Sequence, residues 1–265
     1  MVRTAAMKLG QKALKVAAPR LWVSLAYRRQ LATDVGEHEL IRIAEFVPRG
    51  RRAIDIGCHN GIYAYHLLRL TNEVVAFEAN PSTAAFIRRA LPSVRVENVA
   101  LSSRDGVATL RIPRGTAIHP LDGQATIEPH NALVNEDVDT LTVPTRRLDS
   151  YAFDDAGFIK IDVEGHEEGV LSGALGLIGK SRPNLMIEIE ERHNRNSIAR
   201  TAALLGKFGY RAHFFVPDTG TSDWRLAPLS EFDANLHQSD ELVGMLDRMP
   251  RRRVPYVNNF LFLQE

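Results

Sequence analysis

The sequence predicts an α/β fold in which helices cover both faces of a mostly parallel sheet. From about residue 37 onward, short apolar segments alternate with segments in which apolar residues recur at helical spacing. Buried strands that alternate with helices of about 10–15 residues indicate a parallel sheet with helices on both sides. The hydrophobic content of 45% and the charged content of 25% are those of a globular protein. We expect one such domain over residues 37–265, preceded by a basic helical extension over residues 1–36.

The first half of the domain contains a helix, two strand–helix units and three further strands. Pro48 and Gly50 should end the first helix, and Asn80 can cap a later helix that has Pro81 at its first position. The expected elements are a helix at 39–47, a strand at 53–57, a helix at 63–70, a strand at 73–78, a helix at 81–91, and strands at 94–101, 107–112 and 141–145.

The second half continues the alternation and ends on a strand. The expected elements are a strand at 157–165, a helix at 167–179, a strand at 184–190, a helix at 196–209 that Gly209 closes, and strands at 210–216 and 257–263. Two long segments, 113–140 and 217–255, are expected to be insertions that form a substrate lid, since loops of this length in a compact domain are commonly functional.

The extension differs in charge from the rest of the chain. Residues 1–33 contain seven of the 33 Lys and Arg residues and no acid, which leaves 26 basic against 32 acidic residues, a net charge of −6, in the remainder. A domain with a net negative charge has no general attraction for nucleic acid, so we expect no nucleic-acid partner. Leu9, Ala13 and Val16 share one helical face beside lysines, and Pro19 should end that helix. This helix could pack on the domain or lie on an anionic membrane surface; a cleaved signal peptide is disfavoured because Arg20 interrupts any apolar core.

Cys58 is the single cysteine of the 265 residues, so no disulfide can form within them, which fits a reducing compartment. No run of 18 apolar residues occurs. We therefore expect a cytoplasmic protein, with peripheral contact to the inner face of the membrane through residues 1–33 as an open alternative.

Glycines and acids follow several predicted strands at the end that parallel strands share. Ligands of such sheets bind outside the carboxyl ends of the strands, near the point where the strand order reverses. This edge should therefore bring together the turn 57–61, Glu78, the segment 162–166 and the segment 188–193, which are far apart in the sequence.

The turn after the strand 53–57 has the pattern Asp55-x-Gly57-x-x-x-Gly61. A strand, a glycine turn and a helix N-terminus form a nucleotide site in general terms. The dinucleotide fingerprint, however, needs a glycine where His59 stands. A carboxylate such as Asp55 would repel a phosphate but attract an ammonium or a sulfonium group. S-adenosylmethionine carries both of these cations and no phosphate.

Glu78 supports the same interpretation. It lies 21 residues after Gly57, at the end of the next strand, where an acid can accept hydrogen bonds from both ribose hydroxyls. The alternative is that the two glycines only make a tight turn and that Asp55 caps a helix, since short motifs match by chance. The combination of Asp55 with Glu78 favours a site for a cationic nucleoside.

Five segments occur in a fixed order: AIDIGCHNGIYAYHLL (53–68), VVAFEANP (74–81), NVALSSRDG (98–106), TRRLDSY (145–151) and FIKIDVEGHEEGVLSGA (158–174). In this order they resemble the FkbM family of S-adenosylmethionine-dependent methyltransferases, over about residues 52–190, and the final strand NNFLFL also fits. The resemblance implies the Rossmann-like fold of class I methyltransferases, a seven-stranded, mostly parallel sheet with an antiparallel last strand. Family members are mostly O-methyltransferases that act on hydroxyls of sugars, glycolipids and secondary metabolites.

The resemblance also implies roles for individual residues. The turn would surround the methionine end of the cofactor, Glu78 would hold the ribose, and Asn98 and Ala100 would lie near the adenine. His59 and Tyr63 could close over the turn, and Cys58 is expected to be a small structural residue in it. The candidate cofactor-binding residues are Asp55, Gly57, Cys58, His59, Asn60, Gly61, Tyr63, Glu78, Ala79, Asn80, Asn98, Ala100 and Asp162.

Methyl transfer to an alcohol needs a base or a metal ion, because the hydroxyl is a poor nucleophile until its proton is being removed. His166 could be the base, since an imidazole has an ordinary pKa of about 6.5, or it could only cap a helix. Asp162 and Glu188 could share an ion such as Mg²⁺, or hydrogen-bond to helix N-termini. Lys160 is expected to pair with an acid. The candidate catalytic residues are His166, Asp162, Glu164, Glu188 and His193, and the candidate metal ligands are Asp162 and Glu188.

The function expected from these residues is S-adenosylmethionine-dependent O-methylation of a hydroxyl on a sugar, a glycolipid or a secondary metabolite. Two alternatives stay open. An NAD-dependent oxidoreductase is disfavoured by His59, and a non-catalytic nucleotide-binding scaffold in a biosynthetic complex is disfavoured by the presence of Asp55, Glu78 and the segment 162–166.

Overall fold

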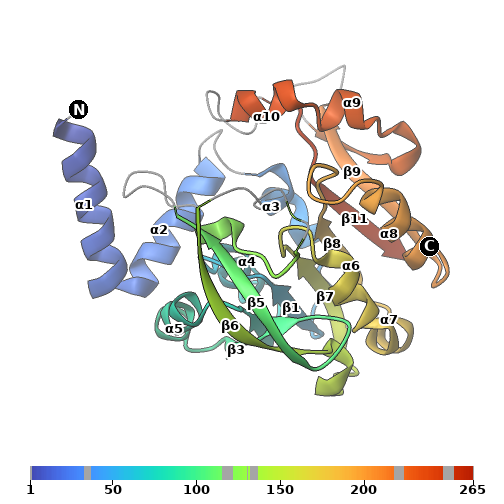
Figure 1. Cartoon of the computed structure of the whole chain (residues 1–265), viewed down its shortest axis with the longest axis horizontal. Coiled ribbons are helices and arrows are strands. Elements are labelled where there is room, and N and C mark those ends of the chain that lie inside the picture. Colours follow the sequence, from blue (N-terminus) through green and yellow to red (C-terminus); the bar gives the residue numbers. More distant parts are fainter. Residues whose placement is uncertain are drawn as a thin grey trace.

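A computed structural model of the chain describes residues 2–32, 37–114, 122–129, 131, 137–217, 224–246 and 254–264. Its helices are α1 (Val2–Ala17), α2 (Pro19–Ala32), α3 (His38–Arg42), α4 (Ile62–Leu67), α5 (Pro81–Ala90), α6 (Glu167–Ser172), α7 (Leu175–Ser181), α8 (Ser197–Gly206), α9 (Ala234–His237) and α10 (Asp240–Leu246). Its strands are β1 (Arg52–Ile56), β2 (Val74–Phe77), β3 (Arg95–Glu97), β4 (Ala100–Leu101), β5 (Gly106–Pro113), β6 (Val138–Arg146), β7 (Ala156–Ile161), β8 (Asn184–Glu188), β9 (Tyr210–Pro217), β10 (Trp224–Pro228) and β11 (Asn259–Gln264). Figure 1 shows how they are arranged.

The described residues form a central eight-stranded sheet in the order β10-β9-β11-β8-β7-β1-β2-β3. The neighbours from β8 to β3 are all parallel, whereas β11 runs antiparallel between β8 and β9. The α/β class and the antiparallel last strand are thus confirmed. The sheet has one strand more than the seven predicted, because β10, from a segment predicted to be an insertion, pairs antiparallel with β9.

The strand order reverses at β1. The chain adds β2 and β3 on one side of β1 and then places β7 and β8 on its other side. The connections after β1 and β7 therefore leave the sheet in opposite directions and open a crevice at the carboxyl ends of these two strands. This is the edge to which the sequence assigned the glycine turn and the segment 162–166.

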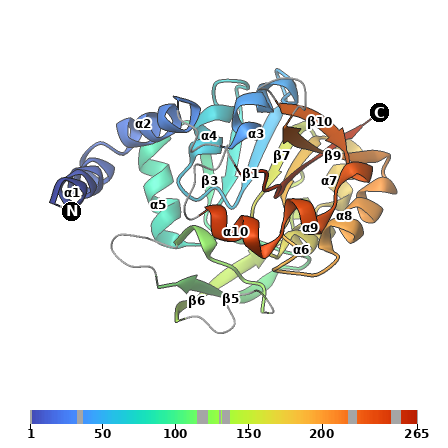
Figure 2. The same cartoon turned by 90° about the horizontal axis from the view of Figure 1, so that it is seen from above.

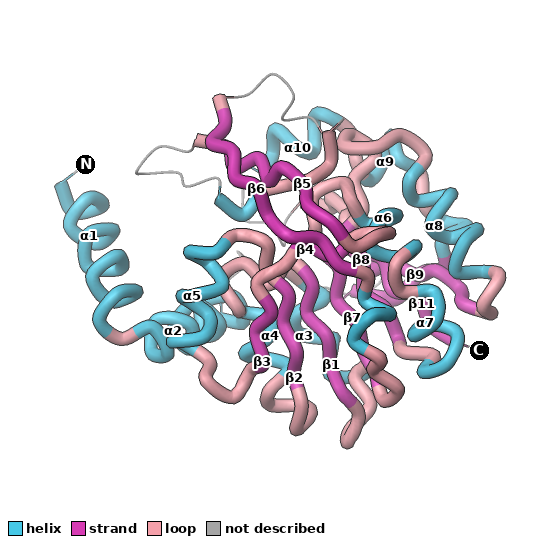
Figure 3. Tube along the Cα trace, turned by 60° about the horizontal axis from the view of Figure 1, so that its bottom comes forward, coloured by secondary structure: helices cyan, strands magenta, loops and turns pink. Residues whose placement is uncertain are grey.

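The single strand predicted at 94–101 is wrong, because the chain divides there into β3 and β4, which belong to different sheets. Asn98 lies at the division, and its side-chain amide donates hydrogen bonds to the main-chain oxygens of Glu78 (2.8 Å) and Ala79 (3.0 Å). β4 then pairs with β6, and β6 pairs with β5, in a three-stranded sheet over the edge of the central sheet (Figure 3). The strands predicted near 107–112 and 141–145 belong to this second sheet.

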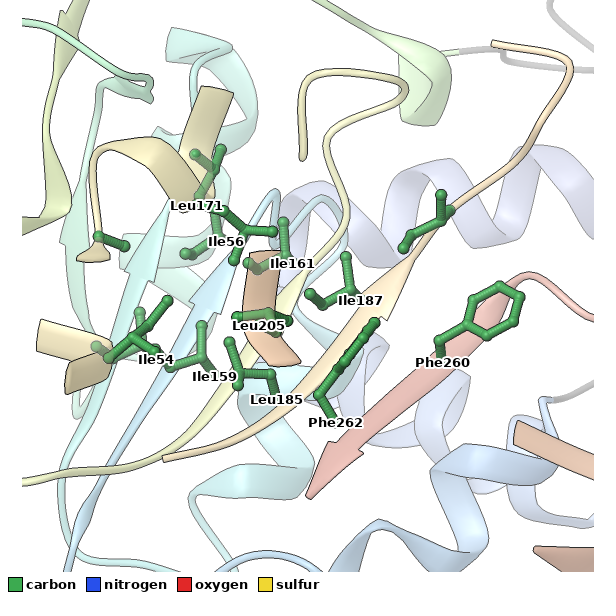
Figure 4. Close-up of a cluster of buried hydrophobic side chains, with 14 of the residues drawn as sticks. Ile54, Ile56, Ile159, Ile161, Leu171, Leu185, Ile187, Leu205, Phe260 and Phe262 are labelled. Atoms are coloured by element: carbon green, nitrogen blue, oxygen red, sulfur yellow. The ribbon is translucent and has the colours of Figure 1, made fainter. Parts of the chain in front are cut away.

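Two apolar layers hold the helices to the central sheet. Successive residues of a strand point to opposite faces, so Ile159 packs in a cluster with Leu205 of α8, whereas Phe158 belongs to a cluster with Val23 of α2. The first layer also includes side chains of α6 and α7 (Figure 4), and the second includes side chains of α4 and α5. Helices on both faces of the sheet are thus confirmed.

Some helix boundaries differ from the prediction. The helix expected at 167–179 is divided into α6 and α7 at Gly173, where a Cβ atom would lie 2.1 Å from the main-chain oxygen of Ser102. The helix expected at 39–47 consists of α3 and a short 3-10 turn, Ile43–Glu45. The segment 217–255 contains β10, α9 and α10, which its weak periodicity did not predict.

The basic extension consists of α1 and α2, which lie along one side of the molecule (Figures 1 and 2). Pro19 begins α2, as the break predicted at this residue requires. Val23 and Tyr27 of α2 are buried, and the ring of Trp22 meets the edge of Phe86 of α5 at a centroid distance of 5.7 Å. α2 therefore packs on the domain. α1 reaches the domain through Lys15, which donates a hydrogen bond to Oδ1 of Asn60 (2.9 Å), and the rest of α1 extends away (Figure 1). No helix in the described part of the chain has the length and apolar composition needed to cross a bilayer.

Candidate functional site

The glycine turn after β1 lies directly against the segment that follows β7. Gly57 has a φ of +77°, and a Cβ atom there would lie 1.7 Å from the main-chain oxygen of Asp162. Gly61 has a φ of +73° at the start of α4, where a Cβ atom would lie 2.7 Å from Cδ1 of Ile87. Only glycine satisfies both conditions without strain, so the two glycines fix the shape of this turn.

Two pockets open on either side of the turn. The first, the β2-side pocket, is lined by Glu78 and Ala79 after β2, by the strands of the second sheet and by residues 123–127. The other, the α2-side pocket, is lined by Asp55, the turn, Lys160 and residues of the segment 30–40. Gly57, His59 and Asp162 line both pockets. The pockets are therefore two parts of one site at the reversal of strand order.

Glu78 is the carboxylate at the end of β2 in the β2-side pocket. Its two carboxylate oxygens accept hydrogen bonds from the backbone N–H groups of His59 (3.0 Å) and Asn80 (2.8 Å). Burial raises the pKa of Glu78, and these N–H groups oppose the rise. Each oxygen can accept a second hydrogen bond. Among the described residues, no Lys or Arg lines this pocket, and most of its lining is apolar.

His59 occupies the position where a dinucleotide-binding turn has its second glycine. Its φ of +40° is left-handed, which is uncommon for a residue with a side chain. A Cβ atom on Gly123 would lie 3.0 Å from Cε1 of the His59 ring, so the segment 123–127 meets the turn there. Tyr63 lines the α2-side pocket, and its hydroxyl donates a hydrogen bond to Glu37. His59 and Tyr63 thus both line the α2-side pocket.

Asp55 is only 1% exposed and lines the α2-side pocket. Its Oδ2 atom is buried and has no hydrogen-bond partner among the described residues. Burial raises the pKa of Asp55 to about 7, although the positive charge of Lys160 opposes this rise. A buried carboxylate oxygen that lacks a partner costs free energy. This atom is therefore suited to receive a cationic donor from a ligand.

Lys160 occupies the space between the two predicted metal ligands. Its ammonium lies 3.4 Å from Oδ2 of Asp162 and 3.7 Å from Oε2 of Glu188, and the side chain is 1% exposed. Burial opposes the charged form, but the surrounding carboxylates outweigh it and raise the pKa of Lys160 above its ordinary value. A metal ion shared by Asp162 and Glu188 does not fit this arrangement, because the ammonium already supplies the positive charge. In the described residues, no group of three or more His, Cys, Asp or Glu could hold a metal ion.

His166 lines the β2-side pocket, but both of its ring nitrogens are engaged. Nε2 lies 2.9 Å from Oγ of Ser102, and Nδ1 lies 3.0 Å from Oε2 of Glu128. Gly169 leaves room for the ring, since a Cβ atom there would lie 2.3 Å from Nε2. His166 occupies the N-cap position of α6, as the alternative to the base role predicted, but its side chain makes no capping hydrogen bond. His166 therefore links the segments that carry Ser102 and Glu128. Because both ring nitrogens bond to these partners, neither is directed to a hydroxyl of a substrate.

Glu164 and His193 form a separate cluster beside the pockets. Nε2 of His193 lies 3.3 Å from Oε2 of Glu164 and 3.7 Å from Oε2 of Glu190. Asn131 bonds to Nδ1 of His193 at 3.1 Å. None of these residues lines either pocket, and neither does Glu188, whose carboxylate accepts a hydrogen bond from Asn258. Of the five candidate catalytic residues, only Asp162 and His166 line the site.

The candidate cofactor-binding residues divide in a similar way. Asn80 and Asn98 line neither pocket; Asn80 caps α5 by accepting a hydrogen bond from Ser82 (3.0 Å), and Asn98 holds the loop after β2. Ala79 and Ala100 do line the β2-side pocket. Cys58 lines the α2-side pocket, and burial raises the pKa of its thiol. Asn60 lines the α2-side pocket, whereas Gly61 lines neither pocket and packs against Ile87.

Two groups of lining residues were not predicted from the sequence. Gln30 and Glu37 reach the α2-side pocket from segments outside the resemblance, and no pattern in the sequence marks them. The segment 123–127 lines the β2-side pocket, although it was predicted as part of a substrate lid. The hydroxyl of Thr126 in this segment donates a hydrogen bond to the main-chain oxygen of Glu164 (2.8 Å). Residues 115–121, 130, 132–136, 218–223 and 247–253 of the two predicted insertions lie outside the described residues.

The site as a whole has the chemistry of a receptor for a cationic nucleoside. A fixed carboxylate in an apolar pocket can accept hydrogen bonds from ribose hydroxyls while apolar walls cover a base. The unpartnered oxygen of Asp55 in the adjoining pocket fits an ammonium group. A nucleoside and an ammonium group are the two ends of S-adenosylmethionine, so the residues present fit this cofactor.

A model of a methyltransferase domain matches the part of the chain that contains most of this site. The model of the FkbM methyltransferase domain matches residues 55–212, whereas no curated protein matches the chain. An FkbM methyltransferase from Methylobacillus flagellatus KT has 15% identity and a TM-score of 0.47, over 80% of this chain and 43% of that one. The chain thus spans less than half the length of that protein.

Two other solved structures have similar likeness. A TehB-like SAM-dependent methyltransferase from Corynebacterium glutamicum has 13% identity and a TM-score of 0.41, over 91% of this chain and 97% of that one. An rRNA methylase from Streptococcus thermophilus has 9% identity and a TM-score of 0.42, over 86% and 95%. The match of the domain model covers more than half of the chain and includes the glycine turn, Glu78 and Asp162. The chain belongs to the FkbM methyltransferase family.

Proposed function

We propose that the protein transfers a methyl group from S-adenosylmethionine to a hydroxyl of a sugar, a glycolipid or a secondary metabolite. The observation that supports it most is the buried Oδ2 atom of Asp55, which has no partner among the described residues, beside a glycine turn of methyltransferase type. When bound, S-adenosylmethionine supplies a methyl carbon that its sulfonium makes electrophilic. The chain's own residues must bind this cofactor, align an acceptor and take up a proton.

The two pockets bind the cofactor. Asp55 accepts hydrogen bonds from the ammonium of the methionine part, which removes the cost of its unpartnered oxygen. Glu78, fixed by two backbone N–H groups, accepts hydrogen bonds from the ribose. Apolar side chains such as Val99 and Leu110 cover the base. Pyrophosphate recognition is disfavoured because no Lys or Arg of the described residues lines the β2-side pocket.

Proton uptake is assigned to Asp162. Among the described residues it is the one carboxylate that lines both pockets, and its side chain is 31% exposed. The ammonium of Lys160 lies 3.4 Å from Oδ2 of Asp162 and holds the carboxylate in place. His166 is less suited, because its nitrogens are engaged by Ser102 and Glu128. Alignment of the acceptor with the methyl donor contributes more to the rate than proton uptake does. In well-oriented systems such alignment lowers the barrier by roughly 7–11 kcal/mol.

Calorimetric titration tests the assignment, with S-adenosylmethionine and NAD as parallel ligands and an acceptor screen read by mass spectrometry for a gain of one methyl group. Binding of the first ligand with methylation of a hydroxyl compound supports the proposal. Binding of NAD alone favours the oxidoreductase, and binding without turnover on any acceptor favours the scaffold. The same turnover assay in EDTA addresses a metal requirement: we expect undiminished activity, because Lys160 lies between Asp162 and Glu188.

A further inference from the structure

One face of the molecule is built from three segments that contain no acidic residue. These are residues 1–33, which include α1 and α2, residues 58–72 around α4, and residues 79–96 around α5. The sequence separates them, but α2 packs on both α4 and α5, through pairs such as Trp22 with Phe86 and Tyr27 with Tyr65. The fold therefore places all three on the same side (Figures 1 and 2).

Among the described residues, four arginines of this face lack an acidic partner, although Arg95 of the same face pairs with Glu97 at 2.8 Å. Arg20, Arg28, Arg69 and Arg89 are exposed, and none of them takes part in an ion pair within the described part of the chain. Arginines elsewhere on the surface do form such pairs, as Arg200 does with Glu168 at 2.6 Å. Because residues 34–265 carry a net charge of −6, the positive charge of the molecule is concentrated on one side.

Large apolar side chains are exposed among these cations. Val16 of α1 is 70% exposed, and Leu21 and Leu25 of α2 are 50% and 45% exposed. Leu21, Leu25 and Arg28 are spaced at i, i+4 and i+7, so they share one stripe of α2, while Val23 and Tyr27 face the core. α2 therefore presents an apolar stripe that ends in arginines, on the side away from the domain.

A cationic groove lies next to this stripe. Arg20 and Tyr65 line two adjoining hollows, one of which also contains Arg69 and the other Leu21 and Arg89. Three guanidinium groups thus surround a shallow depression beside an exposed leucine. Guanidinium groups bind phosphate oxygens strongly and with two hydrogen bonds each.

We propose that this face, made of α1, α2 and the groove of Arg20, Arg69 and Arg89, is a docking surface for an anionic phospholipid membrane. The exposed leucines insert between lipids and the arginines contact head-group phosphates, as amphipathic helices with basic polar faces do. The apolar stripe decides against a nucleic acid, whose backbone offers no apolar surface to Leu21 and Leu25. Arg20, Arg69 and Arg89 line neither of the two site pockets, and the proposal does not depend on the reaction that the protein catalyses.

The test is co-sedimentation of the full-length protein with vesicles of phosphatidylcholine containing 30% phosphatidylserine, and with vesicles of phosphatidylcholine alone. The groove variant carries Arg20→Gln, Arg69→Gln and Arg89→Gln together. Each Arg close to an anionic surface contributes about a factor of five to partitioning, so we expect binding to fall on the order of 100-fold. A second variant, Leu21→Ser with Leu25→Ser, should weaken binding without removing charge.

The matched control carries Arg49→Gln, Arg104→Gln and Lys207→Gln, which removes three exposed cations from outside the face. It should bind vesicles as the unchanged protein does, and circular dichroism of each variant verifies folding. The proposal is overturned if the unchanged protein fails to bind the anionic vesicles, or if both triple variants lose the same affinity. Binding of a single-stranded RNA of mixed sequence in preference to the vesicles, with the same dependence on the groove arginines, would assign the face to nucleic acid.

Discussion

Asp55→Asn should make the unliganded protein more stable and the cofactor complex weaker. The folded-state pKa of Asp55 is raised from 3.8 to about 7 because the carboxyl is buried. Between these two values the folded protein holds a proton that the unfolded chain has released, so stability falls as pH rises from about 4 to 7. A difference of about three pKa units corresponds to about 4 kcal/mol, which the ionised Asp55 costs at pH 8. Asparagine has the same shape and no charge.

The gain in stability expected for Asp55→Asn depends on pH, because it comes from the ionisation of Asp55. At pH 8 the variant should unfold at a temperature about 10 °C higher than the unchanged protein, since each kcal/mol shifts the midpoint by roughly 2–4 °C in a chain of this size. Near pH 4 the carboxyl of Asp55 is neutral in the folded protein and only about half ionised in the unfolded chain, so the two midpoints should nearly coincide. Differential scanning calorimetry across this pH range measures the effect. Asp154→Asn, a change at an exposed acid, serves as the control and should leave the midpoint unchanged.

Cofactor binding should respond in the opposite direction. Loss of a charge-assisted hydrogen bond to the ammonium costs about 1.5–3 kcal/mol, or roughly 10–150-fold in the Kd for S-adenosylmethionine. Affinity of the unchanged protein should rise with pH through 7, because the ionised Asp55 is the form that binds a cation. The reasoning is refuted if Asp55→Asn binds the cofactor as tightly as the unchanged protein, or if the variant is equally destabilised at pH 5 and pH 8.

Three further changes test the remaining parts of the site. Lys160→Met should lower the free energy of unfolding by about 1.5–3 kcal/mol, because it removes the buried ammonium that pairs with the partly exposed carboxylates of Asp162 and Glu188. Urea unfolding measures this, and an unchanged midpoint would contradict it. Glu78→Gln should weaken S-adenosylmethionine binding at least tenfold in calorimetry, since one charge-assisted hydrogen bond is worth about 1.5 kcal/mol or more. Because the glutamine nitrogen cannot accept the N–H of His59 or Asn80, circular dichroism verifies the fold of this variant. Equal affinity would remove Glu78 from the ribose role. Asp162→Asn should lower kcat at least 100-fold, as loss of a general base does. His166→Asn should lower kcat less than tenfold. A larger loss of kcat in the His166 variant than in the Asp162 variant would make His166 the base.

The sequence by itself determined the strand–helix alternation and the edge at which the site lies. The apolar runs around Ile54 and Ile159 could only be buried strands, and the helices between them required parallel pairing. The glycine turn and Glu78 follow consecutive strands, so their positions at one edge followed from local pattern alone. Backbone requirements of this kind act over a few residues, and a single sequence therefore contains them.

The sequence did not determine which side chains reach the pockets. Asp162, Glu164 and Glu188 were all predicted to be catalytic, yet the chain leaves β7 at Ile161 and Glu164 takes a left-handed backbone conformation that turns it to His193. Contacts across the sheet also decided that Lys160 occupies the proposed metal position. These outcomes depend on distances between strands that no local pattern encodes.

The same distinction applies to the parts that lie outside the resemblance. Charge counting identified a basic N-terminal extension, but only the packing of α2 on α4 and α5 brought its arginines next to Arg69 and Arg89. Likewise, Glu37 and the segment 123–127 became pocket walls through tertiary contacts alone. Propensity and spacing fix the elements and their order, because these depend on neighbours in the chain; the final composition of a site depends on neighbours in space, which only the folded structure brings together.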